Sequence, residues 1–447
     1  MGNIKNIVII GNGISGITAA RHIRKRSDDP ITIISAETDH FFSRTALMYI
    51  YMGHMKYEST KPYEDWFWGK NNLQLLKGFV KKVDTDKKEL QLHSGKILGY
   101  DILIIATGSK PNKFGWPGED LKGVQGLYSY QDLENMQIFT RGIRRAVVVG
   151  GGLIGIEMVE MLLSREIPVT FLVREASFWD MVLPSGESAM VNRHIREHEV
   201  DLRLETELEK ILPDDKGRAR AVISSGGEEI PCQFVGLAVG VHPNIGFLKE
   251  SKVDTDRGIL VNPYFETNIP DVYAIGDCVQ YSEPLPGRKP IEQVWYTGRI
   301  HGETVALTIT GKRTPYQPGP WFNSAKFFDI EYQVYGNVSN VAGKNETSVY
   351  WEDQAGKRSI RLVYAMDTRT LLGVNLMGVR FRHQVCDNWI RDKISIDEAV
   401  RNLNKAFFDA EFSDNPLPMV TDQYNRQNPD HPVHMKKSKS FISNIFS

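Results

Sequence analysis

Two glycine-rich segments have the spacing G-x-G-x-x-G, which suits the binding of a dinucleotide pyrophosphate. In such a turn the first glycine makes a tight bend, the second lets the backbone approach the phosphates, and the third lets the next helix pack closely on the strand. Amide groups at the start of that helix then face the phosphates. Two copies predict two bound dinucleotides, one in each turn. The glycines form two sets, Gly11, Gly13 and Gly16, and Gly150, Gly152 and Gly155.

Each turn lies between a predicted strand and a predicted helix. Residues 5–11 (KNIVIIG) have the pattern of a buried strand, 14–26 that of a helix, and 31–35 (ITIIS) that of a second strand. The same order restarts near residue 144 and ends with the strand VTFLV at 169–173. This duplication predicts two Rossmann-like domains. Glu37 follows ITIIS, where a carboxylate could hold a ribose hydroxyl.

The remaining segments predict further strands and a change of architecture. Residues 73–108 are expected to form a β-meander whose last strand, DILIIATG, is buried, and the Pro/Gly-rich stretch 109–120 is expected to be a linker. From about residue 321 the sequence alternates in the manner of strands and predicts a smaller α+β domain.

Composition excludes several classes of protein. A chain of 447 residues is too long for one core, and its net charge of −1 gives no reason to expect nucleic acid as a partner. The three cysteines are far apart, which suits a reducing compartment and excludes a cysteine zinc cluster. No apolar run approaches the roughly 18 residues of a spanning helix, and the sequence starts directly in a strand. We therefore predict a cytoplasmic protein without a membrane segment.

Five segments resemble, in order and approximate spacing, the flavoproteins with two dinucleotide-binding domains, the pyridine-nucleotide-disulfide oxidoreductase superfamily. They are IIGNGISG, IIATG, VVVGGGLIGIE, VGVHPN and VYAIGDC. The resemblance implies that the first turn holds FAD and the second NAD(P)H, which delivers hydride to the flavin. It implies an FAD-binding domain formed by 1–115 and 250–320, an NAD(P)H-binding domain at 116–249, and a C-terminal α+β interface domain at 321–447.

The resemblance also implies which residues contact the cofactors. The reaction requires no side-chain nucleophile, so no residue has a certain catalytic role. Asp277 matches an Asp that contacts the flavin ribitol or the pyrophosphate. Glu157 matches a Glu near the nicotinamide and flavin, with a first-turn Glu stabilised by the helix dipole as the alternative. Trp295 is expected either near the isoalloxazine or in the core. The other implied residues are Ser15, Arg44, Ala106, Thr107, Gly108 and Ile154.

One branch of the superfamily fits better than the rest. Residues 35–53 contain no cysteine, so the thiolate that disulfide and peroxide reductases need is absent. The segment is similar to that of ferredoxin, rubredoxin and putidaredoxin reductases, the nitrite reductase flavin module and apoptosis-inducing factor. Glu37 and Arg44 match the acid and the flavin-contacting Arg of that branch. Tyr49 departs from the Lys of ferredoxin reductases, which leaves the acceptor open.

The expected protein is an FAD-dependent NAD(P)H oxidoreductase whose acceptor is a small redox protein such as a rubredoxin or ferredoxin. Two alternatives are a quinone or small-molecule reductase and a redox-responsive interaction protein of the apoptosis-inducing-factor type. The final domain is expected to provide contacts to the acceptor or to a second copy of the chain in a homodimer.

The end of the strand VTFLV bears on the choice of nicotinamide. Val173 stands where NAD-selective proteins place a carboxylate, and Arg174 follows. A guanidinium pairs well with a 2′-phosphate, which favours NADPH. Glu175 could instead hold the 2′-hydroxyl and repel a phosphate. We expect both cofactors to react, with a slight preference for NADPH.

Two further patterns indicate no function. HIREH at 194–198 fits H-x-x-E-H, but we expect a solvated helix face there and no metal. The tail 436–447 combines lysines with apolar residues and is expected to be a docking segment or frayed end, with an amphipathic membrane contact as the alternative.

Overall fold

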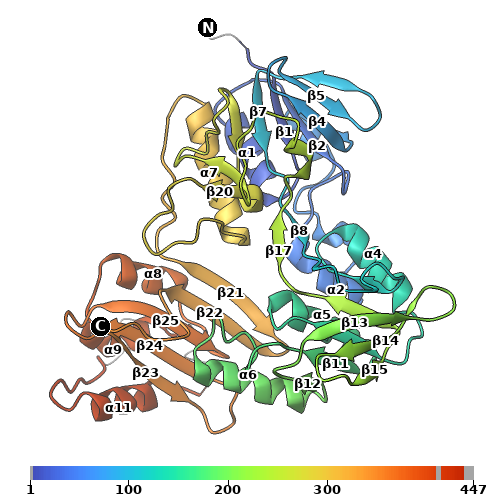
Figure 1. Cartoon of the computed structure of the whole chain (residues 1–447). Coiled ribbons are helices and arrows are strands. Elements are labelled where there is room, and N and C mark those ends of the chain that lie inside the picture. Colours follow the sequence, from blue (N-terminus) through green and yellow to red (C-terminus); the bar gives the residue numbers. More distant parts are fainter. Residues whose placement is uncertain (1–3, 409–413, 437–447) are drawn as a thin grey trace. The chain divides into compact units, whose positions relative to one another are not determined.

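The computed structural model of the chain describes residues 4–408 and 414–436. The chain forms two compact units, each built from two segments of the sequence (Figure 1). Unit 1 contains residues 1–170 and 207–318, and unit 2 contains residues 171–206 and 319–447. The basic and apolar tail from residue 437 onward lies outside the described residues.

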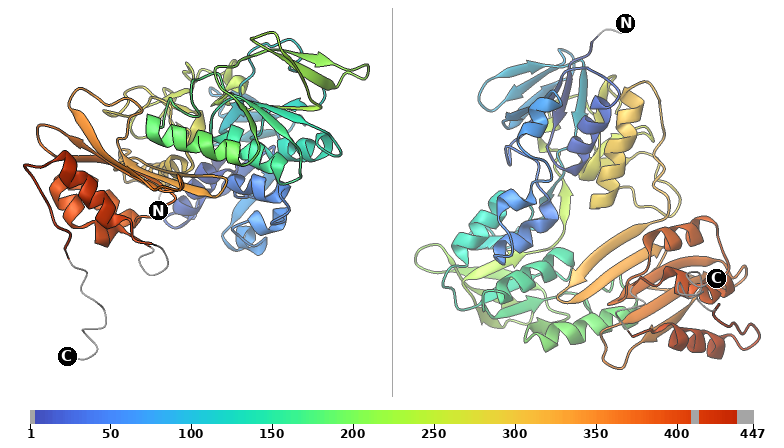
Figure 2. Two further views of the ribbon diagram at one scale, coloured as in Figure 1. Left: turned by 90° about the horizontal axis from the view of Figure 1, so that it is seen from below. Right: turned by 180° about the vertical axis from the view of Figure 1, so that it is seen from behind.

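The first sheet of unit 1 has five parallel strands in the order β19-β7-β1-β2-β3. Helix α1 (Ile14–Arg24) follows β1 and packs beside α7 (Trp295–Ile309), as Figures 1 and 2 show from two sides. The inner strands are apolar and buried on both faces, as parallel strands covered by helices require. The strands are β1 (Ile7–Ile10), β2 (Ile31–Ser35), β3 (Leu73–Lys77), β7 (Ile102–Ile105) and β19 (Val272–Ala274).

Strand β3 corrects the prediction of a meander over 73–108. It pairs in parallel with β2 at the edge of this sheet, and the mixed polar and apolar residues of an edge strand do not indicate the direction of pairing. The meander itself contains only β4 (Val80–Asp84), β5 (Glu89–Leu92) and β6 (Ile97–Gly99). The expected linker begins with a short strand, β8 (Ser109–Pro111), which pairs with β17 (Val241–Pro243).

The second set of parallel strands in unit 1 has β10 beside β16 and β16 beside β9. Helix α5 (Leu153–Leu163) follows β10, and at β11 (Val169–Leu172) the chain passes into unit 2. An antiparallel sheet of β13, β14 and β15 follows. The remaining elements of unit 1 are α2 (Leu47–Tyr51), α3 (Trp66–Lys70), β9 (Val124–Gln125), α4 (Tyr130–Phe139), β10 (Ala146–Val149), β13 (Leu208–Pro213), β14 (Ala219–Ser224), β15 (Glu229–Pro231), β16 (Phe234–Leu237), β18 (Ile259–Val261) and β20 (Val279–Tyr281), with 3-10 turns at Arg44–Ala46, Tyr57–Thr60, Gly246–Leu248 and Gly276–Cys278.

Unit 2 is built on an antiparallel sheet of order β21-β22-β25-β24-β23. Helix α6 (Ser185–Glu197) is tied to this sheet by a buried ion pair in which Nε and Nη2 of Arg361 each donate to Glu187 at 2.7 Å. The other elements are β12 (Asp201–Arg203), β21 (Phe322–Phe327), β22 (Ile330–Gly336), β23 (Glu346–Glu352), β24 (Ser359–Ala365), β25 (Leu371–Met377), α8 (His383–Arg391), α9 (Ile396–Arg401), α10 (Leu403–Ala406) and α11 (Leu417–Gln427).

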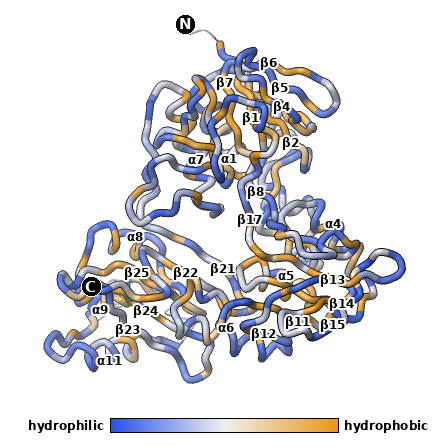
Figure 3. The backbone as a smooth tube through the Cα atoms, viewed as in Figure 1, coloured by the Kyte–Doolittle hydropathy of each residue, from blue (hydrophilic) through white to orange (hydrophobic). Residues whose placement is uncertain are grey.

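The predicted fold class is confirmed: the fold is α/β, with Rossmann-like parallel sheets and a smaller α+β part at the carboxyl end. Apolar residues gather on inner strands such as β1 and β7 (Figure 3). Among the described residues no helix has the length and apolar character that a bilayer crossing needs. The bounds of the three predicted domains stay a prediction.

Candidate cofactor site

Four neighbouring strands of the first sheet end at one edge, and a large cavity lies there. Gly11 follows β1, Glu37 follows β2, Gly108 follows β7, and Asp277 follows β19. The cavity has a volume of about 840 Å³, within the roughly 300–1,000 Å³ of cofactor sites. Open α/β sheets bind ligands at this carboxyl edge. The predicted residues that line it are Gly11, Gly13, Ser15, Glu37, Arg44, Ala106, Thr107, Gly108, Ile154, Glu157, Asp277 and Trp295.

The first glycine turn has the shape of a phosphate cradle. Gly11 has φ +114°, and a Cβ there would lie 2.1 Å from the carbonyl oxygen of Ala106. A Cβ at Gly16 would lie 2.1 Å from the carbonyl oxygen of Gly11, so α1 approaches the turn closely. A Cβ at Gly13 would meet no protein atom within 4 Å. The turn is therefore packed on its inner side and open toward the cavity, which fits a pyrophosphate.

Glu37 and Arg44 form an ion pair on the cavity wall. Arg44 donates from Nη1 and Nη2 to the two carboxylate oxygens of Glu37 at 2.8 and 2.6 Å. The backbone N–H of Tyr130 donates to the same carboxylate at 2.8 Å. The Arg44 guanidinium lies 4.5 Å from the ring centroid of Tyr128 and 5.4 Å from that of Phe42. These contacts fix both side chains, so a ribose hydroxyl would share Glu37 with Arg44.

Asp277 is a half-buried carboxyl with few partners, and it lines the cavity. The hydroxyls of Ser109 and Tyr128 donate to it from 3.5 Å, which is long for a hydrogen bond. Burial raises its pKa to about 6, opposed by the nearby Arg44 guanidinium. A carboxyl so weakly bonded retains capacity for further hydrogen bonds, and a cofactor with hydroxyl or phosphate groups can supply them. The residues present therefore fit FAD.

His301 supports the turn that carries Asp277. The backbone N–H of Gly276 donates to Nδ1 of His301 at 3.0 Å, and the hydroxyl of Tyr281 lies 2.6 Å from its Nε2. Burial and then Arg288 lower the pKa of His301 to about 3, so its imidazole is neutral. A neutral ring can accept at Nδ1 and donate from Nε2, as both contacts require.

The second glycine turn repeats this geometry, and its helix reaches the same cavity. Gly150 has φ +110°, and a Cβ there would lie 2.4 Å from the carbonyl oxygen of Ala238, whereas a Cβ at Gly152 would meet nothing within 4 Å. Ile154 and Glu157 on α5 line the cavity. The first turn of α5 contains no acidic residue, so the alternative of Glu157 as a first-turn Glu stabilised by the dipole is wrong.

Thr107 and Asn244 join two segments that the sequence separates by 137 residues. The Thr107 hydroxyl donates to the carbonyl of Asn244 at 2.8 Å, and the Asn244 N–H donates to the carbonyl of Gly108 at 2.9 Å. Asn244 lines the cavity, and it ends the VGVHPN segment that the sequence had marked only as a motif. Trp295 also lines the cavity, so it is a wall residue rather than a core residue.

All three cysteines of the chain are buried and free. Cys278 is nearest to the cavity residues, directly after Asp277, and its Sγ lies 3.3 Å from the carbonyl oxygen of Ile275. Burial raises the pKa of this thiol to about 11, so it is not a thiolate near neutral pH. The cavity thus offers no redox-active disulfide and no reactive thiolate.

Reduction of the purified holoprotein by excess dithionite under anaerobic conditions should consume two electrons per flavin. A flavin without a partner disulfide accepts only two, and no long-wavelength thiolate–flavin band should appear during the titration. Consumption of four electrons per flavin would reveal a second redox centre and contradict this expectation.

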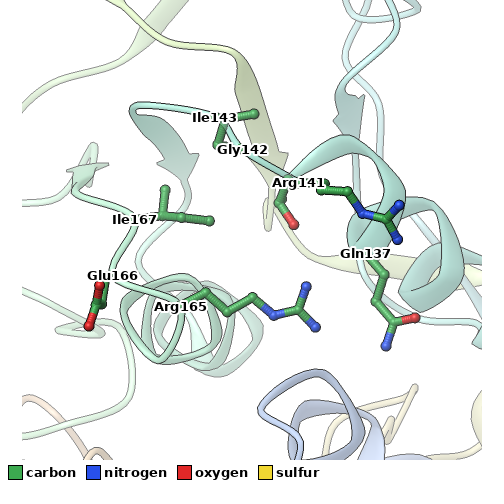
Figure 4. A pocket seen from close by; sticks show the side chains of 8 residues that line it. Gln137, Arg141, Gly142, Ile143, Arg165, Glu166 and Ile167 are labelled. Carbon is green, nitrogen blue, oxygen red and sulfur yellow. The ribbon is translucent and has the colours of Figure 1, made fainter.

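A second cavity, of about 540 Å³, lies at the ends of α4 and α5 and shares no lining residue with the first. The side chains of Gln137, Arg141 and Arg165 face it (Figure 4). Arg165 also donates to the carbonyl of Tyr51 at 2.6 Å and lies over that ring, which ties α5 to α2. We assign this cavity no part in cofactor binding.

Two predicted features lie in unit 2. Arg174 is exposed and pairs with Glu175 at 2.9 Å. His194 of the HIREH segment has only 1% of its side chain exposed, so the prediction of a solvated helix face is wrong for this residue. It faces the β21–β22 turn instead of water, because Asp329 lies against it.

The family profile described as pyridine nucleotide-disulphide oxidoreductase matches residues 5–302. The chain belongs to this family. It is therefore an FAD-dependent NAD(P)H oxidoreductase, and the missing disulfide places it apart from members that use one.

The curated relatives differ in length. The chain is 32% identical over 281 residues to the nitrite reductase [NAD(P)H] of Bacillus subtilis, which covers 62% of the chain and 34% of that protein. It is 29% identical over 373 residues to a ferredoxin–NAD(P)(+) reductase of a Sphingomonas species, with 82% and 88% covered. It is 26% identical over 408 residues to the NADH-rubredoxin oxidoreductase of Clostridium acetobutylicum, with 89% and 98% covered. The chain thus spans about a third of the first relative and most of the other two.

Solved structures share the fold. A NAD-dependent persulfide reductase from A. fulgidus superposes with a TM-score of 0.84 at 24% identity, covering 95% of this chain and 83% of that one. The ferredoxin reductase for the CYP199A2 system from Rhodopseudomonas palustris superposes with a TM-score of 0.76 at 21% identity, covering 83% and 91%.

The flavin potential should depend on the ionisation of Glu157. Burial, and then repulsion from Glu160, raise its pKa to about 7. Below this pH the carboxyl is neutral, and above it a negative charge opposes the addition of electrons to a flavin in the same cavity. One pKa unit of coupling corresponds to about 30 mV for a two-electron couple.

Potentiometric titration between about pH 6 and 8 should therefore show an extra fall in the midpoint potential above pH 7. Glu157→Gln should remove this inflection, and Glu166→Gln, at an exposed position after the end of α5, should retain it. An inflection that persists in Glu157→Gln would assign it to another group.

Proposed function

We propose that this protein takes hydride from NAD(P)H onto FAD and passes the electrons singly to a small redox protein, a ferredoxin or rubredoxin. The observation that supports this most strongly is the single cavity that the first glycine turn and the start of α5 both line. Such a cavity lets two cofactors meet. The ferredoxin and rubredoxin reductases that match most of the chain support the choice of acceptor.

The proposed roles follow from the positions of the residues. Gly11, Gly13 and Gly16 receive the FAD pyrophosphate with Ser15, while Glu37 and Arg44 lie toward the adenosine ribose. Asp277 bonds the ribitol or pyrophosphate, and Trp295 borders the flavin. The second turn, at Gly150, Gly152 and Gly155, receives NAD(P)H, and Glu157 lies near the nicotinamide. Bound flavin supplies the hydride and single-electron chemistry, and the protein supplies placement and electrostatics.

Steady-state turnover with a panel of acceptors tests the proposal. Ferredoxin or rubredoxin should be reduced faster than quinones at equal concentration, with NADH or NADPH as donor. Specificity for quinones would show that the acceptor is a small molecule and not a redox protein. Slow turnover with every acceptor, together with assembly that depends on NAD(P)H, would instead assign an interaction protein. A cytoplasmic location and a homodimer stay predictions, which fractionation and sedimentation can test.

Arg174→Ala should lower the ratio of kcat/KM for NADPH to that for NADH. A guanidinium bonds a 2′-phosphate, and a hydrogen bond to a charged group is worth about 1.5–3 kcal/mol, so a loss of roughly tenfold is expected at this exposed site. Arg196→Ala, which removes an exposed arginine of α6, is the matched control. If the ratio is the same in wild type and Arg174→Ala, Arg174 does not read the phosphate.

A further inference from the structure

In unit 2 the end of α6 lies beside the β21–β22 turn (Figure 1). Two histidines and a carboxylate converge there. His194 lies in the last turn of α6, His198 is the residue that caps the helix, and Asp329 lies in the turn. One ligand atom from each of the three residues lies within 4.8 Å of the others. Imidazole nitrogens and carboxylate oxygens are the ligands of zinc and similar metals.

The turn itself is held in an uncommon conformation. Phe327 pairs with Ile330, which leaves a loop of two residues, and Phe328 has φ 55°. A bulky residue rarely adopts this region, and such outliers persist where the surroundings fix them. The Phe328 ring stacks on His198 with centroids 4.1 Å apart and planes 9° apart. This packing presents Asp329 to His194.

In both histidines, Nε2 is the nitrogen that could face a metal ion. Nδ1 of His198 lies 3.0 Å from the carbonyl oxygen of His194, and only a protonated Nδ1 can bond a carbonyl, so the lone pair is on Nε2. Nε2 of His194 is buried and has no hydrogen-bond partner among the described residues. It lies 2.5 Å from a carboxylate oxygen of Asp329, but at an angle unsuited to a hydrogen bond.

Two charged groups surround Nδ1 of His194: Glu197 favours metal binding at Nε2, and Lys357 opposes it. Glu197 lies 3.4 Å from Nδ1 and can accept its proton, as carboxylates do for metal-bound histidines. Lys357 lies 2.6 Å from the same Nδ1 and 2.6 Å from Glu197. Lys357 can only donate, so its contact requires an unprotonated Nδ1 and opposes metal binding at Nε2.

We propose that His194, His198 and Asp329 bind one Zn²⁺ ion per chain, with water in the open coordination position. The Asp329 side chain is 70% exposed, so an ion can enter from solvent. The bound ion fastens the end of α6 to the β21–β22 turn, in addition to the Glu187–Arg361 pair near the start of the helix. The proposed oxidoreductase activity does not require this site.

The test measures Zn²⁺ binding by the untagged holoprotein after removal of metal with a chelator. Titration against a chromophoric zinc indicator should give one site per chain, and Zn²⁺ should raise the melting temperature. His198→Gln and Asp329→Asn should each weaken binding at least tenfold, whereas His93→Gln, at an exposed histidine of unit 1, should not. Asp329 is on an exposed turn, so its variant tests the site even if His198→Gln folds poorly.

Lys357→Met should strengthen binding by roughly tenfold, the scale of second-shell effects, because it removes the donor that competes for His194. If His194 and Asp329 form only an ion pair, the protein should bind no zinc and Lys357→Met should lose stability. Absence of a site in wild type, or equal binding by wild type and Asp329→Asn, would overturn the proposal.

Discussion

Gly13→Val is expected to yield a folded protein that lacks most of its flavin. The backbone of Gly13 has φ −72° and ψ −177°, which any residue can adopt, and an added Cβ meets no protein atom within 4 Å. That open side is where the pyrophosphate must approach the turn. Overpacking of this kind costs about 1–3 kcal/mol, or roughly 5- to 150-fold in affinity. The flavin-to-protein absorbance ratio and the melting temperature measure the two effects separately.

Two other glycines provide the controls. Gly69→Val changes an exposed glycine that also has open space around it, and it should retain flavin and fold normally. Gly16→Val places a Cβ 2.1 Å from a backbone oxygen, so it should destabilise the protein itself. Wild-type flavin content in Gly13→Val would show that the first turn does not hold the pyrophosphate.

The glycine turns were predictable because their function depends on local backbone geometry. Tight bends, open sides and helix starts are all encoded within six residues, so the spacing alone indicated where phosphates bind. The carboxyl edge of the sheet was predictable for the same reason. Parallel strands that alternate with helices must end on one side, which brings Gly108 and Asp277 to the same cavity.

The contacts across the site were not predictable from spacing. Arg44 reaches Tyr128, which is 84 residues away, and no local pattern marks that tyrosine as a partner of a guanidinium. His301 lies six residues after Trp295 on α7, yet its contact with Gly276 depends on how α7 packs. The buried Glu187 on α6 finds its partner Arg361 174 residues later. Periodicity identifies an apolar face but not the surface it meets.

Both glycine turns have the same open geometry, and each is proposed to bind its own dinucleotide. A change in the second turn should therefore affect NAD(P)H and leave FAD bound. Gly152→Val is expected to remain yellow, because the first turn is unchanged, but to lose reduction by NAD(P)H. Gly152 has φ −109° and ψ −176°, and its Cβ would also meet nothing within 4 Å. The fold therefore accepts the valine, while a second pyrophosphate does not.

Stopped-flow reduction with NADH and NADPH should show kcat/KM lowered by roughly 5- to 150-fold, from the same overpacking cost as in the first turn. Reduction by dithionite should be unchanged, which serves as the internal control for an intact flavin site. If Gly152→Val is reduced by NAD(P)H at the wild-type rate, the second turn does not hold the nicotinamide cofactor. If instead it loses its flavin, the two turns do not act separately, and the assignment of one dinucleotide to each turn fails.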